Sequence, residues 1–122
     1  MTYVLSQKSL DKLKGVDESL VNVVKRAITY TTVDFSVGEG VRTLERQKEL
    51  LVLKTTQTLK SKHLIGHAVD LYALKDGVVS WDKALYPEIA KAMKQAAEEL
   101  SVNIRWGGEF KSFYDGPHFE LT

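Results

Sequence analysis

The chain has 122 residues, of which 43% are hydrophobic and 27% are charged, a composition typical of one soluble globular domain. Its 17 basic and 16 acidic side chains give a formal net charge of +1, so the sequence predicts no electrostatic surface for nucleic acid. Cysteine is absent, which excludes disulfides and thiolate metal sites.

Two kinds of targeting segment are not expected. Residues 1–10 lack a basic stretch followed by a long apolar run, so we expect no secretory signal. No segment approaches the roughly 20 apolar residues that a membrane-spanning helix needs, so we expect no stable membrane association. The sequence therefore predicts a single domain over residues 1–122, made in the cytoplasm.

Two helices are predicted first along the chain. Ser6 can cap a short helix that runs to about Leu13 and ends at Gly15. Asp17 caps a second helix, whose apolar side chains recur at helical spacing. The residues of that face are Leu20, Val21, Val24 and Ala27. A short strand follows over residues 33–37, where apolar and polar side chains alternate.

Helical and extended patterns alternate in the central part of the chain. Thr43 can cap a helix, and the polar residues 55–62 then predict an exposed loop. Residues 68–74 predict a buried strand. A loop begins at Trp81, whose side chain we expect in the core. A helix is predicted over residues 86–100, with one apolar face.

Two strands complete the predicted order. They cover residues 102–106, closed by two glycines, and residues 118–121. The whole order is helices, strand, helix, strand, helix, strand, strand. This mixture predicts an α+β domain with a small, mostly antiparallel sheet and flanking helices.

The three histidines lie in two segments that each also contain an aspartate. The first segment holds His63, His67 and Asp70, and the second holds Asp115 and His118. Two imidazoles and one carboxylate suit a zinc ion that keeps a fourth position open for water, as hydrolytic zinc chemistry requires. A single histidine is more often a surface or core residue, but the recurrence of the pattern favours a metal site.

The spacing within these segments predicts a role for each side chain. Gly66 permits a tight turn or a close backbone approach between His63, on a loop, and Asp70, on the strand that follows. His118 would be the third ligand. Asp115 lies three residues before it, where a turn could bring its carboxylate to the water as general base and later as acid to the leaving amine.

Other side chains near these segments have more than one interpretation. His67 should face away from Asp70, so we interpret it as structural. Glu120 is two residues past His118 and could share its face, which makes it a rival candidate for the base. Trp106 is interpreted as packing beneath the site rather than as a contact to a peptide.

At these residues the sequence resembles a known family. The pattern Ser61-x-His63-x-x-Gly66-x-Ala68-x-Asp70 matches the signature of the zinc D-Ala-D-Ala carboxypeptidases and dipeptidases. The C-terminal segment is especially similar to the phage L-alanyl-D-glutamate endopeptidases. Its matching residues are Trp106-Gly107-Gly108, Asp115 and Pro117-His118-Phe119-Glu120. The resemblance extends from about residue 33 to residue 122.

The resemblance implies roles for particular residues. It makes zinc ligands of His63, Asp70 and His118. Asp115 takes the place of the catalytic acid and base. Arg42 would stabilise the developing oxyanion or bind a substrate carboxylate, which suits a planar guanidinium. Ser61 would orient the substrate. A surface ion pair for Arg42 and a plain loop position for Ser61 remain open.

The implied protein is a zinc-dependent peptidoglycan endopeptidase, a phage endolysin that hydrolyses the L-Ala–D-Glu bond of the stem peptide. Its partner would be that peptide, with no nucleic acid and no separate cell-wall-binding domain, and we expect a monomer. Such an enzyme accumulates in the host cytoplasm. It reaches the periplasm and cell wall after a holin permeabilises the membrane.

Two alternatives stay open at this point. A D,D-carboxypeptidase or dipeptidase acting on D-Ala-D-Ala would use the same ligands, but a secreted form should carry a signal peptide. A non-catalytic zinc-binding module of the same fold should have lost Asp115 or Arg42, and both are present.

Overall fold

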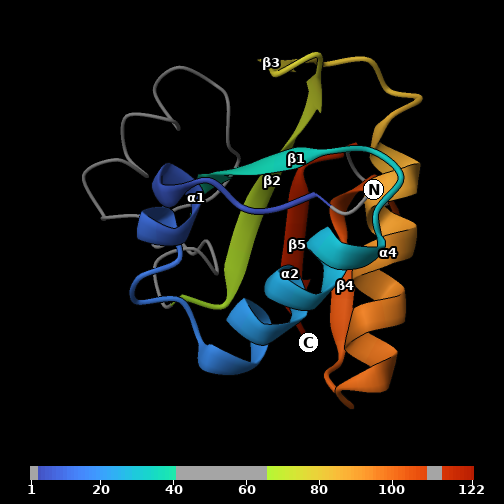
Figure 1. Ribbon diagram of the computed structural model, residues 1–122. Helices are drawn as coiled ribbons and strands as arrows, with labels where there is room; N and C mark the ends of the chain where they lie inside the picture. The colour runs from blue at the N-terminus through green and yellow to red at the C-terminus, as the bar shows by residue number, and fades with distance from the viewer. Residues whose placement is uncertain (1–2, 41–65, 110–113) are drawn as a thin grey trace, which may run out of the picture.

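The computed structural model describes residues 3–40, 66–109 and 114–122 (Figure 1). Three of the predicted site residues, Arg42, Ser61 and His63, lie outside the described residues. The same holds for the helix predicted after Thr43 and for the loop predicted over residues 55–62.

Five short strands form one sheet in the described part of the chain, and every pair is antiparallel. The spatial order is β1-β2-β5-β4, and β3 pairs with β2 outside this path. The strands are β1 (Phe35–Glu39), β2 (Ala68–Lys75), β3 (Val78–Val79), β4 (Ile104–Trp106) and β5 (His118–Leu121). The predicted α+β class with a mostly antiparallel sheet is confirmed.

The described α-helices begin where the sequence predicts, and a short 3-10 turn that was not predicted follows β4. They are α1 (Gln7–Lys12), α2 (Glu18–Tyr30), α4 (Tyr86–Glu99) and the short 3-10 turn η2 (Gly107–Glu109). The Ser6 hydroxyl accepts the backbone N–H of Ser9, and the Asp17 carboxylate accepts that of Ser19. These side chains satisfy amide groups that the first turn of a helix leaves without an intrahelical partner, so both predicted N-caps are confirmed.

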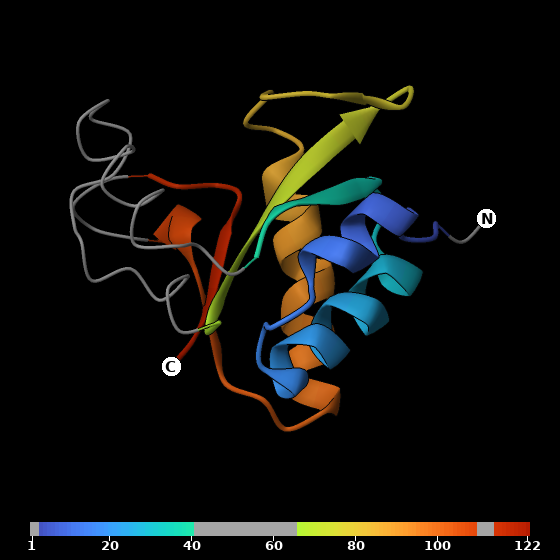
Figure 2. The same ribbon diagram turned by 90° about the vertical axis from the view of Figure 1, so that its left-hand side faces the viewer.

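One face of the sheet is covered by helices, and this is where the core lies. Figure 2 shows α2 and α4 together on one side of the strands. Val69, Leu71 and Ala73 of β2 are fully buried, and Phe119 of β5 joins them in the core. The side chains between them on β2 point to the opposite face, because successive strand residues alternate. Asp70 is therefore placed on the open face.

The first strand lies two residues later than predicted. Val33 is held in a local turn, because its N–H and carbonyl both bond the Thr31 hydroxyl. Regular pairing with β2 starts at Phe35 and is interrupted by a bulge before Glu39. The alternating pattern in the sequence indicates which face of a strand is buried. It does not show where a side chain takes the backbone hydrogen bonds that strand pairing would use.

A hairpin that was not predicted joins β2 to β3. Asp76 and Gly77 form its turn with φ of 53° and 80°, the left-handed conformation that tight hairpins require. The Asp-Gly pair was the signal for this turn. The hairpin leads into Trp81, which was wrongly predicted to be a core residue: its side chain is 63% exposed. No helix among the described residues is long and apolar enough to cross a membrane.

Candidate metal centre

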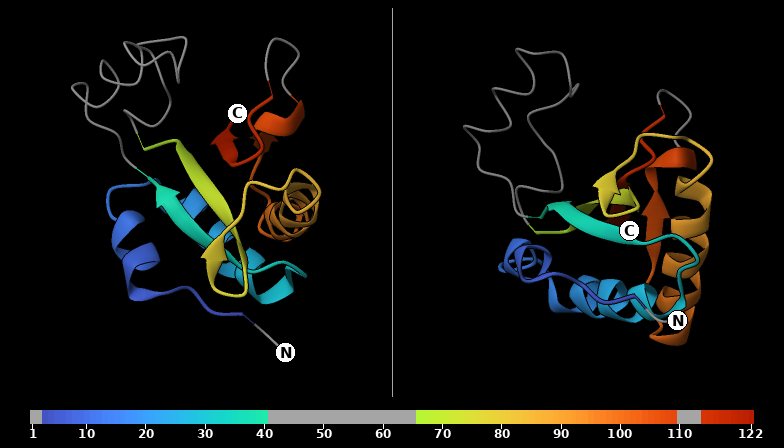
Figure 3. Two further views of the ribbon diagram at one scale, coloured as in Figure 1. Left: turned by 90° about the horizontal axis from the view of Figure 1, so that it is seen from above. Right: turned by 45° about the horizontal axis from the view of Figure 1, so that its top comes forward.

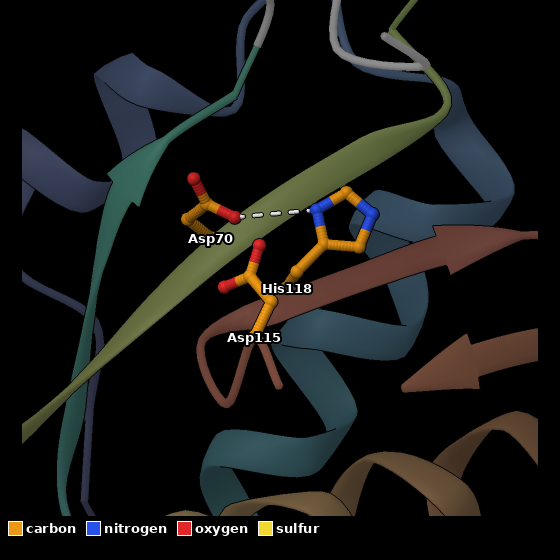
Figure 4. A group of neighbouring side chains, drawn as sticks. All are labelled: Asp70, Asp115 and His118. Atoms are coloured by element: carbon orange, nitrogen blue, oxygen red, sulfur yellow. Dashed lines mark ion pairs between the residues drawn. The ribbon is translucent and has the colours of Figure 1, made fainter. Parts of the chain in front are cut away.

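Two neighbouring strands bring Asp70 and His118 together on the open face of the sheet. Asp70 of β2 lies directly opposite His118 of β5 in the antiparallel register. The Asp70 Oδ1 and His118 Nδ1 atoms are 3.5 Å apart, and the two side chains are 13% and 11% exposed. Figure 4 shows the carboxylate and the ring pointing toward each other. Residues far apart in the sequence thus meet at one point.

Asp115 reaches the same point through the turn that precedes β5. Its N–H donates to the Gly107 carbonyl (3.0 Å), and its own carbonyl accepts the His118 N–H (3.2 Å). The Trp106 indole N–H donates to the Gly116 carbonyl (2.7 Å) and fixes the turn against β4. A Cβ added at Gly107 would overlap the Asp115 carbonyl, so this close approach requires glycine.

The donor atoms of Asp70, Asp115 and His118 all lie within 4.8 Å of one another. Figure 4 shows the three side chains gathered at this point. Zinc binds imidazole nitrogen and carboxylate oxygen at about 2.0–2.2 Å, so two ligand atoms of a tetrahedral site lie roughly 3.4 Å apart. The Asp70–His118 distance of 3.5 Å matches that spacing. The cluster could therefore hold a divalent cation without a large rearrangement.

Glu120 lies on the other side of the His118 ring. Its Oε1 is 2.8 Å from Nε2, and its Oε2 is 3.4 Å from Arg105 Nη2. A carboxylate accepts hydrogen bonds, so a hydrogen on Nε2 would donate to Glu120 and leave Nδ1 facing Asp70. This arrangement, a ligand histidine whose second nitrogen bonds a carboxylate, is common at metal sites and orients the ring. The predicted role of Glu120 as a rival base finds no support in this position.

The carboxylates around His118 favour a positive charge at this site. Burial alone would lower the pKa of His118, but Asp70, Glu120 and Asp115 together raise the pKa above its usual value. The site therefore stabilises positive charge at the imidazole. A bound metal ion would supply that charge in place of the proton.

The remaining predicted features are placed as follows. Gly66 has a φ of 72°, and its carbonyl accepts the Asp17 N–H at 2.8 Å. Of the two expected roles of Gly66, the close backbone approach is thereby confirmed. His67 accepts the Leu121 N–H through its carbonyl and is not part of the metal cluster formed by the described residues. Trp106 packs against the core, as predicted.

Comparisons with known proteins point to one family. A family model described as phage L-alanyl-D-glutamate peptidase matches residues 1–122. The L-alanyl-D-glutamate peptidase of Escherichia phage T5 is 28% identical over 137 residues, with full coverage of both chains. The enzyme of the same name from Listeria phage A118 is 31% identical over 125 residues, but the chain spans only 43% of its length.

A solved structure is also similar. The L-Ala D-Glu endopeptidase ChiX of Serratia marcescens superposes with a TM-score of 0.92 and 46% sequence identity, covering 98% of this chain and 90% of that one. The chain is a peptidase, and on the open face of such a sheet it carries a cluster that could hold a metal ion. It belongs to the phage L-alanyl-D-glutamate peptidase family. The resemblance seen in the sequence is confirmed.

Proposed function

We propose that the chain is a zinc-dependent endopeptidase that hydrolyses the L-Ala–D-Glu bond of the peptidoglycan stem peptide. The observation that carries the proposal is the meeting of Asp70, Asp115 and His118 within 4.8 Å. It occurs in a chain whose relatives carry this activity in their names. The cluster provides side chains that could hold a metal ion and move a proton, as metal-assisted hydrolysis requires. The names of the relatives specify which bond is cut.

The proposed ligands are His63, Asp70 and His118. When bound, zinc acts as a Lewis acid that lowers the pKa of water towards about 7 and polarises the scissile carbonyl. Oxygen and nitrogen donors suit this metal, and Glu120 holds the His118 ring in the orientation that presents Nδ1. His63 is assigned here from the sequence signature.

Asp115 is the proposed general base and acid. Its carboxylate takes a proton from the attacking water and returns the proton to the amine of the D-Glu residue as the peptide bond breaks. The backbone hydrogen bonds of Asp115 to Gly107 and His118 hold its carboxylate near Asp70 and His118. Arg42 is proposed to stabilise the oxyanion that forms on the carbonyl, and Ser61 is proposed to orient the peptide.

The same proposal covers the setting of the enzyme. Residues 1–122 would act as a single catalytic domain and as a monomer. The protein would accumulate in the host cytoplasm and reach the periplasm and cell wall after a holin opens the membrane. The substrate is the stem peptide of the wall.

Metal removal tests the proposal. Purified peptidoglycan is incubated with the protein before and after a chelator has stripped it, and the metal content is measured by mass spectrometry. We expect peptide release to stop in the stripped protein, to return with zinc and not to return with magnesium, because a histidine-containing site favours zinc over a hard oxygen-seeking cation. Undiminished release by metal-free protein would contradict the mechanism.

A further inference from the structure

Two aromatic residues lie close to the metal cluster along the chain, and a third packs against one of them. We call Tyr72, Trp81 and Tyr114 the aromatic surface. The Tyr72 and Trp81 rings meet edge to face, with centroids 5.0 Å apart. Lys83 Nζ lies 5.0 Å from the centre of the Tyr114 ring. Trp81 is 63% exposed and Tyr114 is 43% exposed, so large apolar area stays in contact with water.

The aromatic surface is connected to the cluster along the chain at two places. Tyr72 is two residues after Asp70 on β2, so both side chains lie on the open face of the sheet. Tyr114 directly precedes Asp115. The rise of a strand puts two residues roughly 7 Å apart along it. The aromatic surface therefore begins within one substrate residue or two of the cluster.

The segment that carries Trp81 is fixed to the sheet. The Tyr86 hydroxyl donates to the Ser80 carbonyl (2.8 Å) and accepts the Ala73 N–H (3.3 Å). Ser80 N–H donates to the Ala73 carbonyl (2.8 Å). Figure 3 shows this segment crossing from β3 to the start of α4. A tryptophan that is exposed, carried by a segment fixed to the sheet and packed against Tyr72 marks a binding surface better than an isolated apolar residue does.

The chemistry of the substrate indicates which part of it this surface would bind. Near the scissile bond the stem peptide offers a methyl group and carboxylates, none of which has a broad apolar face. The sugar to which L-Ala is attached has such a face, formed by the C–H groups of its ring, and an aromatic ring packs well against it. One residue, roughly 3.5 Å long, and a short lactyl linker separate the scissile bond from that sugar. The sugar is therefore within reach of the aromatic surface.

We propose that the aromatic surface binds the sugar of the glycan strand on the amino side of the scissile bond, with Trp81 as the platform. This inference rests on the proposed function, because the sugar lies on the amino side of the scissile bond only if the L-Ala–D-Glu bond is the one that is cut. The enzyme would then prefer stem peptides that are still attached to glycan over free ones.

Two substrates and two variants of Trp81 test the proposal. The substrates are a disaccharide-linked stem peptide and the same peptide with an acetyl group in place of the sugar. For Trp81→Ala we expect KM for the sugar-linked substrate to rise about tenfold, the size of one lost aromatic contact, with kcat little changed. Cleavage of the acetylated peptide should stay the same within about twofold. Trp81→Phe should restore much of the affinity.

Tyr30→Ala is the matched control. Tyr30 lies on α2, on the helix-covered side of the sheet, where its hydroxyl bonds Glu99. We expect this variant to cleave both substrates like the unmodified protein. Equal loss on both substrates in Trp81→Ala, or a wild-type enzyme without preference for the sugar, would overturn the proposal.

A binding experiment separates this inference from the proposed function. The disaccharide without peptide is titrated into the protein, and the tryptophan fluorescence is recorded. We expect saturable binding that Trp81→Ala loses and Tyr30→Ala keeps, whether or not any peptide is cleaved. Absence of cleavage alongside intact binding would count against the endopeptidase only. Absence of saturable binding by the wild-type protein would count against the aromatic surface.

Discussion

At the scale of single residues, Asp115 carries the proton in the proposed reaction. Asp115→Asn keeps the shape of the side chain and removes its ability to take a proton. We expect kcat on purified peptidoglycan to fall by about 10²- to 10⁴-fold, the usual contribution of general acid–base catalysis. Metal content should stay unchanged. Asp11→Asn, an exposed change on α1, is the control and should keep full activity. Full activity in Asp115→Asn with metal bound would show that another group is the general base.

Glu120 acts through His118 in this structure, and its removal tests that role. Glu120→Ala deletes the carboxylate that bonds Nε2 and frees the ring to turn. We expect zinc affinity, measured by competition with a chromogenic chelator, to fall about 10- to 100-fold. Glu120→Gln keeps an acceptor for Nε2 and should lose less. Glu109→Ala, an exposed glutamate paired with Lys94, is the control. An unchanged affinity in Glu120→Ala would show that the ring needs no such support.

At the scale of elements, the contact between Gly107 and the turn before β5 sets the position of Asp115. Gly107→Ala adds a Cβ that overlaps the Asp115 carbonyl and comes close to the His118 Cβ. The turn must shift, and a displacement of about 1 Å can cost roughly 100-fold in rate. We therefore expect activity to fall by about that factor while the far-ultraviolet circular dichroism stays native. Gly77→Asn is the control, because Gly77 has open space around it and asparagine tolerates its left-handed φ. Equal activity in both variants would argue against a fixed turn.

The sequence predicted elements well where local chemistry decides them. Ser6 and Asp17 cap helices because their side chains accept amides of the first turn, and that signal needs only a few residues. The start of β1 was misplaced because the Thr31 hydroxyl competes for the backbone of Val33. Trp81 was wrongly placed in the core because apolar character alone does not distinguish packing from a surface beside a site.

At the scale of the whole molecule, the site depends on strand order, which spacing in the sequence does not reveal. Asp70 and His118 are opposite each other only because β5 pairs with β2. The signature around Gly66 and the C-terminal pattern predicted which side chains should meet, and the sheet brings Asp70, Asp115 and His118 together. The supporting role of Glu120 was not foreseen, since its contact with the far ring nitrogen depends on how the His118 side chain is turned.

The identity of the bond that is cut tests the central claim most directly. Purified peptidoglycan is digested with the zinc-loaded protein, and the products are identified by mass spectrometry. The proposed function predicts glycan strands that end in L-Ala, together with released peptides that begin with D-Glu. Release of D-Ala alone, with the L-Ala–D-Glu bond intact, would contradict it and assign the chain a carboxypeptidase activity.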